Sequence, residues 1–167
     1  GNSTTIPFDV TDASMAKMIL LSLAETVASR LRRDQRKAEV ISVEIKDFQL
    51  HTVSHQKTLN CATNITSELH QAACQLFDEL WEGQPIRLLG IHTSHLCGQE
   101  EARQISLFDG ADYEKQEKLD AAIDKIRERY GVDSVQREVF VGSPIDHMCG
   151  RVTREKRKVD YSKIDVK

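Results

Sequence analysis

Two amphipathic segments constrain the fold of this chain most. Apolar residues recur three and four positions apart through residues 13–33 and again through residues 65–82, which is the spacing of one face of an α-helix. Thr11 or Asp12 can cap the first helix, and Asn64 can cap the second. Each helix therefore has one apolar face that must pack against another element of the fold.

Strand patterns stand before, between and after these helices. Residues 38–46 alternate between apolar and polar side chains, and the run after Asp47 is rich in β-branched and hydroxyl residues, so the two segments are expected to form a hairpin. Residues 3–8 and 86–96 predict one further strand each. The order β-α-β-β-α-β predicts an α+β fold, with two helices packed on one face of a four-stranded, mostly antiparallel sheet.

The chain is expected to divide into four parts. Residues 1–97 form the domain just described, and residues 98–113 form an exposed, acidic linker without periodicity. Residues 114–141 contain a third helix and a candidate short strand over 135–141, and residues 142–167 form a basic, flexible tail. One stripe of the third helix carries Leu119, Ala122, Ile123, Ile126 and Tyr130.

Composition excludes several classes of protein. Hydrophobic residues make up 40% and charged residues 29% of the 167 residues, so the chain can form a compact core. It has no apolar run near the roughly 20 residues of a membrane helix, and its N-terminus lacks the features of a signal peptide. The 4 cysteines form no CxxC pair, which favours reduced thiols in a cytoplasmic protein.

The net charge of −3 is unevenly distributed along the chain. Residues 1–97 carry 9 basic and 11 acidic side chains, residues 98–150 carry 7 and 12, and residues 151–167 carry 7 and 3. The last segment therefore has a net charge of +4. It could attract phosphate without specificity, or it could be a solubilising end of the chain.

One face of the predicted sheet is polar. Side chains that alternate with the buried positions point away from the helices, and they are Thr52, Ser54, Gln56, Thr58, Gly90, His92 and Ser94. An antiparallel sheet can leave such a face to water or to a ligand, and composition alone favours water.

Six collinear segments, which span roughly residues 1–140, resemble one known family. The segments are GNSTTIPFDVTD, RLRRD, HTVSHQKTL, LWEGQPIRLLGIHTSHL, QISLFD and EKLDAAIDKIRERYG. Together they are similar to the C-terminal part of Y-family translesion DNA polymerases of the bacterial DNA polymerase IV kind, namely the little finger domain and its extension. The resemblance implies the strand order given above and a polar face that lies along primer–template DNA.

The resemblance also implies which parts of the polymerase this chain lacks. The palm, with its metal-binding acidic triad, would precede Gly1, so the chain is expected to be a non-catalytic fragment of a DNA-directed DNA polymerase. Magnesium is expected for that parent protein, and no cofactor is expected for the fragment.

The polar strands supply the donors that backbone phosphates need, and contacts of this kind are independent of DNA sequence. The resemblance implies a DNA-binding role for Thr52, Ser54, His55, Gln56, Lys57, Thr58, Arg87, Gly90, His92 and Ser94. Family members often have basic residues at the positions of Arg87, Leu88 and His92. Here Leu88 is apolar and His92 is mostly neutral at pH 7, so the grip on DNA is expected to be weaker.

A short apolar motif interrupts the acidic linker. It resembles the sliding-clamp-binding motif of the same family and consists of Gln104, Ile105, Ser106, Leu107 and Phe108. The apolar side chains would enter a pocket of the clamp, and Gln104 would form a hydrogen bond beside it. The alternative is that Leu107 and Phe108 fold back on the third helix.

Other sites have little support in the sequence. The spacings of the candidate ligands match no familiar zinc pattern, and these ligands are His92, His95, Cys97, His147 and Cys149. Three further histidines and two cysteines are expected to be structural or surface residues, and they are His51, His55, His70, Cys61 and Cys74. The alternative function is a protein-interaction adaptor that does not contact nucleic acid, in keeping with the net negative charge.

Overall fold

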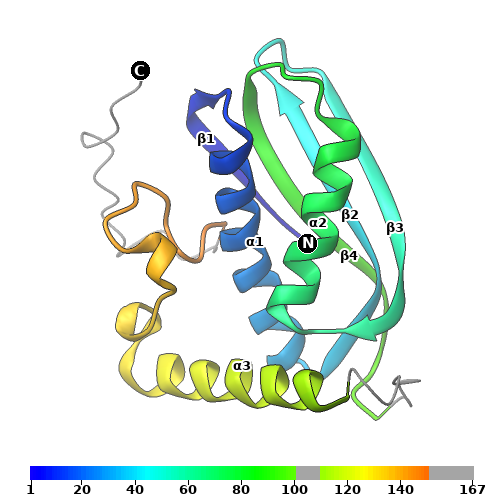
Figure 1. Cartoon of the computed structure of the whole chain (residues 1–167), viewed down its shortest axis with the longest axis vertical. Coiled ribbons are helices and arrows are strands. Elements are labelled where there is room, and N and C mark those ends of the chain that lie inside the picture. The colour runs from blue at the N-terminus through cyan, green and yellow to red at the C-terminus, as the bar shows by residue number, and fades with distance from the viewer. Residues whose placement is uncertain (101–109, 151–167) are drawn as a thin grey trace.

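The computed structural model describes residues 1–100 and 110–150 (Figure 1). Its elements follow the predicted order: β1 (Asn2–Val10), α1 (Ala13–Arg33), β2 (Arg36–Asp47), β3 (Thr52–Thr63), α2 (Thr66–Leu80), β4 (Ile86–Gly98) and α3 (Gly110–Tyr130). Two short 3-10 helices follow, η1 (Val132–Ser134) and η2 (Glu138–Phe140).

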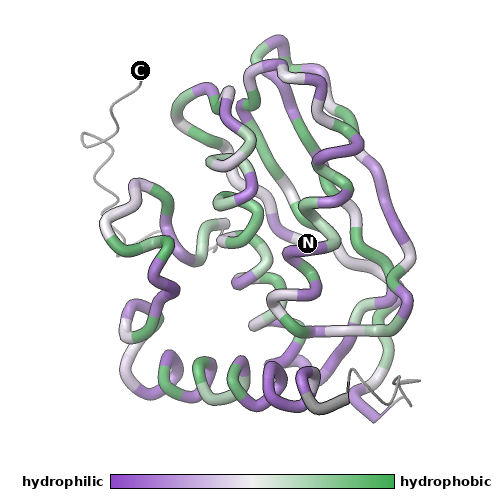
Figure 2. Tube along the Cα trace, in the orientation of Figure 1, coloured by the Kyte–Doolittle hydropathy of each residue, from purple (hydrophilic) through white to green (hydrophobic). Residues whose placement is uncertain are grey.

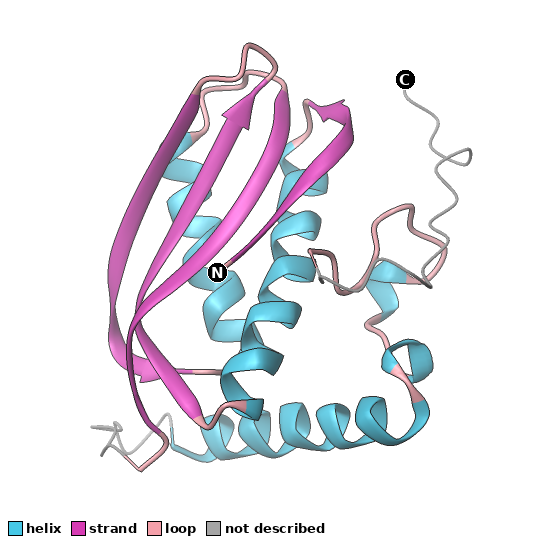
Figure 3. Cartoon of the chain, turned by 180° about the vertical axis from the view of Figure 1, so that it is seen from behind, coloured by secondary structure: helices cyan, strands magenta, loops and turns pink. Residues whose placement is uncertain are grey.

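The four strands form one sheet in the order β1-β4-β2-β3, and every pairing is antiparallel. The helices α1 and α2 lie side by side on one face, and the other face is bare of described helices (Figure 3). The predicted α+β fold is therefore confirmed. The bare side is called the open face below.

The core lies between the two helices and the sheet. Apolar positions of α1 and α2 contact alternate residues of the strands, among them Leu20, Leu23, Leu69, Phe77 and Ile91, which are all fully buried. This is the packing that helical periodicity and strand alternation require of a two-layer fold.

The start of α1 follows the sequence prediction, whereas the start of α2 does not. The side chain of Asp12 accepts a hydrogen bond from the Met15 amide and caps α1. The prediction that Asn64 caps α2 is wrong, because its Nδ2 donates instead to the Arg36 carbonyl. A carboxylate from α3 takes the capping role, since Asp120 Oδ2 accepts a hydrogen bond from the Thr66 amide at 2.9 Å.

The segment after α3 differs from the prediction in two ways. Residues 135–141 contain η2 and turns, so the expected short strand is wrong. Residues 142–150 are also not a flexible tail, because they pack against α1, with Met148 buried. Residues 151–167 and the motif at 104–108 lie outside the described residues.

Two hydroxyl groups one turn apart on α1 explain the position of residues 142–150. Ser22 Oγ donates to the Asp146 carbonyl and accepts from the Cys149 amide at 2.8 Å. Thr26 Oγ1 donates to the Cys149 carbonyl at 3.0 Å, and Asn2 Nδ2 donates to the same carbonyl at 2.9 Å. These bonds satisfy backbone groups of an irregular segment, which would otherwise lose their hydrogen bonds to water.

Candidate nucleic-acid interface

Strand register decides which side chains belong to the open face. In β2, Ile41, Val43 and Ile45 are buried against the helices, so Ser42, Glu44 and Lys46 project to the opposite side. Residues directly opposite each other on paired strands share a face. The partners of β2 therefore assign the residues of its two neighbours.

The edge strand β3 contributes hydroxyl and amide groups to the open face. Thr52, Ser54 and Gln56 lie opposite Lys46, Glu44 and Ser42, respectively. Thr58 lies opposite Val40 and is exposed as well. These four predicted DNA-binding residues are therefore brought together on one surface.

His55 and Lys57 lie on the helix side of the same strand, although they belong to the predicted site. Their partners across the ladder are Val43 and Ile41. Both side chains interact with α2: Lys57 Nζ donates to Gln75 Oε1 at 2.7 Å, and His55 Nδ1 lies 3.3 Å from Glu79 Oε2. A ligand on the open face would not contact them directly.

The central strand β4 adds Leu88, Gly90 and His92 to the open face, opposite Lys46, Glu44 and Ser42. Ser94 lies one step further along the strand, opposite Val40. Gly90 is buried between its neighbours, and a Cβ there would lie 3.1 Å from Ser3 Cβ and 3.3 Å from His92 Nε2. A ligand on the open face would therefore contact Ser3 and His92 before it reached Gly90.

Arg87 stands at an irregularity of the sheet. The pairing of β2 with β4 shifts between Lys46 and Asp47, so Arg87 has no regular partner on β2. Its Nε lies 3.7 Å from Asp9 Oδ1, and both side chains are about half exposed. Asp9 therefore compensates part of the Arg87 charge.

Several residues of the open face were missing from the prediction. Ser3 and Thr5 of β1 lie opposite Gly90 and Leu88, and both are exposed. Ser42 and Lys46 extend the face across β2. The alternation of residues 38–46 is the signal that could have included the β2 residues, whereas no sequence pattern places β1 beside β4.

The centre of the open face, formed by residues 40–46 of β2 and their partners, is close to neutral. Glu44 and Lys46 carry its formal charges, and these cancel. Arg36 adds a positive charge at the end of the ladder, where it is exposed opposite Gly98. The remaining side chains are hydroxyls, one amide, His92 and Leu88. The surface can donate and accept hydrogen bonds, but it attracts phosphate only weakly at long range.

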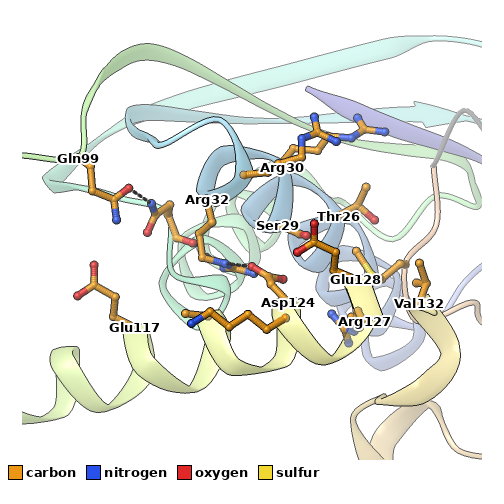
Figure 4. A pocket seen from close by; sticks show the side chains of 15 residues that line it. Thr26, Ser29, Arg30, Arg32, Gln99, Glu117, Asp124, Arg127, Glu128 and Val132 are labelled. Carbon is orange, nitrogen blue, oxygen red and sulfur yellow. Dashed lines mark hydrogen bonds and ion pairs between the residues drawn. The ribbon is translucent and has the colours of Figure 1, made fainter. Parts of the chain in front are cut away.

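A separate cavity of about 410 Å³ lies between α1 and α3 (Figure 4). Its walls carry charges of both signs, including Arg30, Lys125, Glu117 and Glu128. Because the charges are mixed, the cavity shows no preference for an anion or a cation.

Buried ion pairs beside this cavity fix α3 to α1. Arg32 of α1 donates through Nη2 to Asp124 Oδ1 at 3.1 Å (Figure 4). Its Nη1 donates to Asp120 Oδ2 at 3.0 Å. Glu25 of α1 accepts from Arg127 Nη1 at 2.8 Å and also from Arg137. These contacts set both the position and the rotation of α3.

One histidine and one cysteine lie in contact on α2, but they do not form an activated nucleophile. Cys74 Sγ lies 3.2 Å from His70 Nε2. Burial raises the pKa of the Cys74 thiol and lowers the pKa of His70, so both groups are neutral at pH 7.

The described residues form neither a candidate metal site nor a candidate membrane span. Within residues 1–100 and 110–150, the structure brings together no group of three or more His, Cys, Asp or Glu side chains that could hold a metal ion. His147 of the candidate set instead lies 3.0 Å from Asp133. None of the helices in these ranges combines the length and apolarity needed to cross a membrane.

Comparison with curated proteins identifies relatives with one shared name. DNA polymerase IV of Clostridium acetobutylicum is 37% identical over 140 residues, which cover 84% of this chain and 35% of the relative. DNA polymerase IV of Acetivibrio thermocellus is 36% identical over 143 residues, covering 84% and 36%. The chain thus spans about a third of the length of these relatives.

Solved structures give weaker similarities. One is described as a complex of a beta-clamp processivity factor and the little finger domain of PolIV, with a TM-score of 0.48 and 23% identity over 63% of this chain and 94% of that one. Another is a post-insertion binary complex of Dbh DNA polymerase, with a TM-score of 0.47 and 18% identity over 57% of this chain and 28% of that one.

The family model for the impB/mucB/samB family C-terminal domain matches residues 1–107. This match covers well over half of the chain. The chain therefore belongs to this family and carries its C-terminal domain, the little finger of Y-family DNA polymerases.

Proposed function

We propose that this chain is the non-catalytic DNA-gripping part of a lesion-bypass DNA polymerase. The observation that carries the proposal is the bare open face, on which hydroxyl and amide side chains from four adjacent strands line one surface. Neutral donors of this kind suit the phosphate and sugar oxygens of a duplex, and they do not distinguish one DNA sequence from another.

The chain would support catalysis by positioning. A second contact with the duplex holds the primer end near an active site located elsewhere in the polymerase. Residues 104–108 would tether the enzyme to a sliding clamp, which raises the effective concentration of the polymerase at DNA. We expect magnesium to act in the palm of the polymerase, and we assign no cofactor to this chain.

Lys46 and Lys57 provide a matched test of the proposal, because they have the same charge and lie on opposite faces of the sheet. Replacing the cation on the open face should weaken duplex binding, whereas replacing the cation beside α2 should have little effect. We expect Lys46→Glu to lower the affinity for duplex about tenfold at low salt, equally for two unrelated sequences, and Lys57→Glu to lower it less than threefold.

Fluorescence anisotropy with two labelled duplexes measures both variants, and circular dichroism confirms that each variant is folded. Equal losses for Lys46→Glu and Lys57→Glu would show that the open face is not the DNA surface. A loss confined to one of the two duplexes would contradict recognition that is independent of sequence.

A protein-interaction adaptor is the second candidate function. The observation that favours it is the zero formal charge at the centre of the open face, over residues 40–46 of β2 and their partners, since DNA-binding surfaces are usually positive. The salt dependence of duplex binding separates the two functions, because an adaptor without nucleic-acid contact has no duplex affinity to lose.

A further inference from the structure

The helix α3 turns its apolar stripe toward solvent. Leu119 is 54% exposed, Ile126 is 39% exposed and Tyr130 is 68% exposed, and Ala122 is exposed between them. These four residues recur at intervals of three and four and are called the α3 stripe below. Figure 2 shows apolar residues recurring along this helix. A stripe of this kind normally packs against another element.

Charged residues hold α3 in this orientation. The buried positions of the helix are Asp120, Arg127 and Tyr113. Asp120 binds Arg32 and caps α2, and Arg127 binds Glu25. Rotating the helix to bury Leu119 and Ile126 would break these ion pairs and leave their charges without partners. The helix therefore holds the stripe in a fixed, exposed orientation.

Charged residues of both signs border the stripe. Lys115 and Arg129 are exposed beside it, and Lys118 Nζ lies 3.8 Å from Glu114 Oε2. Asp112 is exposed seven residues before Leu119, which places it on the same face of the helix. The carboxylates farther along α3 lie elsewhere: Asp120 is buried, and the others line the cavity next to α1, namely Glu117, Asp124 and Glu128. An apolar stripe with a charged border has the composition of a protein interface, whose apolar centre is surrounded by a polar rim.

The position of the stripe indicates what that partner is. The proposed clamp-binding motif ends at Phe108, two residues before α3 begins at Gly110. At 1.5 Å per residue, Leu119 lies only about 14 Å along the helix from Gly110. A clamp that holds Leu107 and Phe108 must therefore lie beside the first turns of α3.

We propose that the α3 stripe is a second contact with the sliding clamp, on an apolar surface next to the groove that takes residues 104–108. This inference rests on the clamp tether of the proposed function. Exposed Leu and Ile side chains favour a protein partner over duplex DNA, whose phosphates select cations and polar donors.

Binding to the purified sliding clamp of Clostridium acetobutylicum tests the inference. We compare the complete chain with a synthetic peptide of residues 99–110, which contains the motif without α3. The chain should bind the clamp about tenfold more tightly than the peptide, and Leu119→Gln/Ile126→Gln should reduce it to the affinity of the peptide. Leu50→Gln is the matched control, because Leu50 is 62% exposed at the hairpin tip, away from α3.

The outcomes separate this inference from the clamp tether. Leu107→Ala/Phe108→Ala should abolish clamp binding and leave duplex binding intact. Equal affinities of chain and peptide, or full binding by Leu119→Gln/Ile126→Gln, would overturn the second contact and keep the tether. Failure of both chain and peptide to bind would overturn both. Loss of duplex binding in the stripe variant would assign the surface to DNA instead.

Discussion

Glu25 is a buried carboxylate that links α1 to α3 and to the segment after it. Burial opposes its ionisation, yet the charges and hydrogen bonds of Arg137 and Arg127 hold the pKa of Glu25 below its ordinary value of 4.5. Replacing it with Gln removes the counter-charge of the buried Arg127 and leaves Arg137 with its more distant partner Asp120, 3.9 Å away. We expect Glu25→Gln to lower the free energy of unfolding by about 3 kcal/mol in urea denaturation at pH 7.

The pH dependence of the Glu25→Gln effect has a definite sign. Because the pKa in the folded chain is depressed, the stabilisation by Glu25 is complete above about pH 4.5 and is lost as the pH falls through the folded value. The difference between the two proteins should therefore shrink below pH 4.5. The exposed Glu82→Gln is the control and should change stability by less than about 0.5 kcal/mol. A difference that stays constant down to pH 3 would contradict this account.

At the residue scale, strand alternation predicted that Gly90, His92 and Ser94 face away from the helices, and the structure places them on the open face, whereas the residues predicted on β3 lie on both faces. Thr52, Ser54 and Gln56 follow the strand alternation and share the face. His55 and Lys57 belong to the predicted site as polar donors, although alternation alone places them on the other side. Sequence could not reveal the ion pairs of Arg32, because the partner Asp124 is 92 positions away.

At the scale of elements, the sequence predicted the helices and strands of the sheet domain better than the segment after α3. Hydrophobic periodicity reports packing against a core, and α1, α2 and the strands all form that core. Residues 142–150 instead bind α1 through backbone groups and the hydroxyls of Ser22 and Thr26. Backbone hydrogen bonds of this kind leave no periodic signal in the sequence.

Gly150 provides a test of the packing of residues 142–150. It has a φ of +75°, and a Cβ there would clash with the Asn2 side chain, whose amide binds the Cys149 carbonyl. Gly142 has a φ of +74° but no atom within 4 Å of such a Cβ. Both Gly→Ala substitutions strain the backbone, so their difference isolates the contact. We expect Gly150→Ala to destabilise by about 1 kcal/mol more than Gly142→Ala in urea unfolding.

Hydrogen exchange adds a local readout to this comparison. Gly150→Ala should speed exchange of the Cys149 amide, which donates to Ser22 Oγ, and leave the amides of β2 and β4 unchanged. Equal stability and equal exchange in the two variants would mean that the contact with Asn2 contributes nothing.

At the scale of the whole molecule, charged residues lie in two environments: the buried interface between α1 and α3, and the exposed open face. The ion pairs that hold α3 are buried, so salt should affect them little. The open face is exposed and close to neutral at its centre, with Lys46 and Arg36 as the formal cations of its ladders. Arg87, at the irregular start of β4, is partly compensated by Asp9. The two surfaces should therefore respond differently to ionic strength.

Salt titration of duplex binding gives the prediction that belongs to this scale. One or two phosphate contacts release few counterions, so for a chain ending at residue 150 we expect the logarithm of affinity to fall with the logarithm of salt with a slope of about −1 to −2. The complete chain adds residues 151–167, with 7 basic and 3 acidic side chains, and should show a steeper slope where these cations contact DNA. Unfolding of the same chains by urea should change by less than about 1 kcal/mol over the same salt range. A slope near zero for both chains would leave the adaptor as the function of this domain, and identical steep slopes would mean that the described sheet holds more phosphate contacts than its charges suggest.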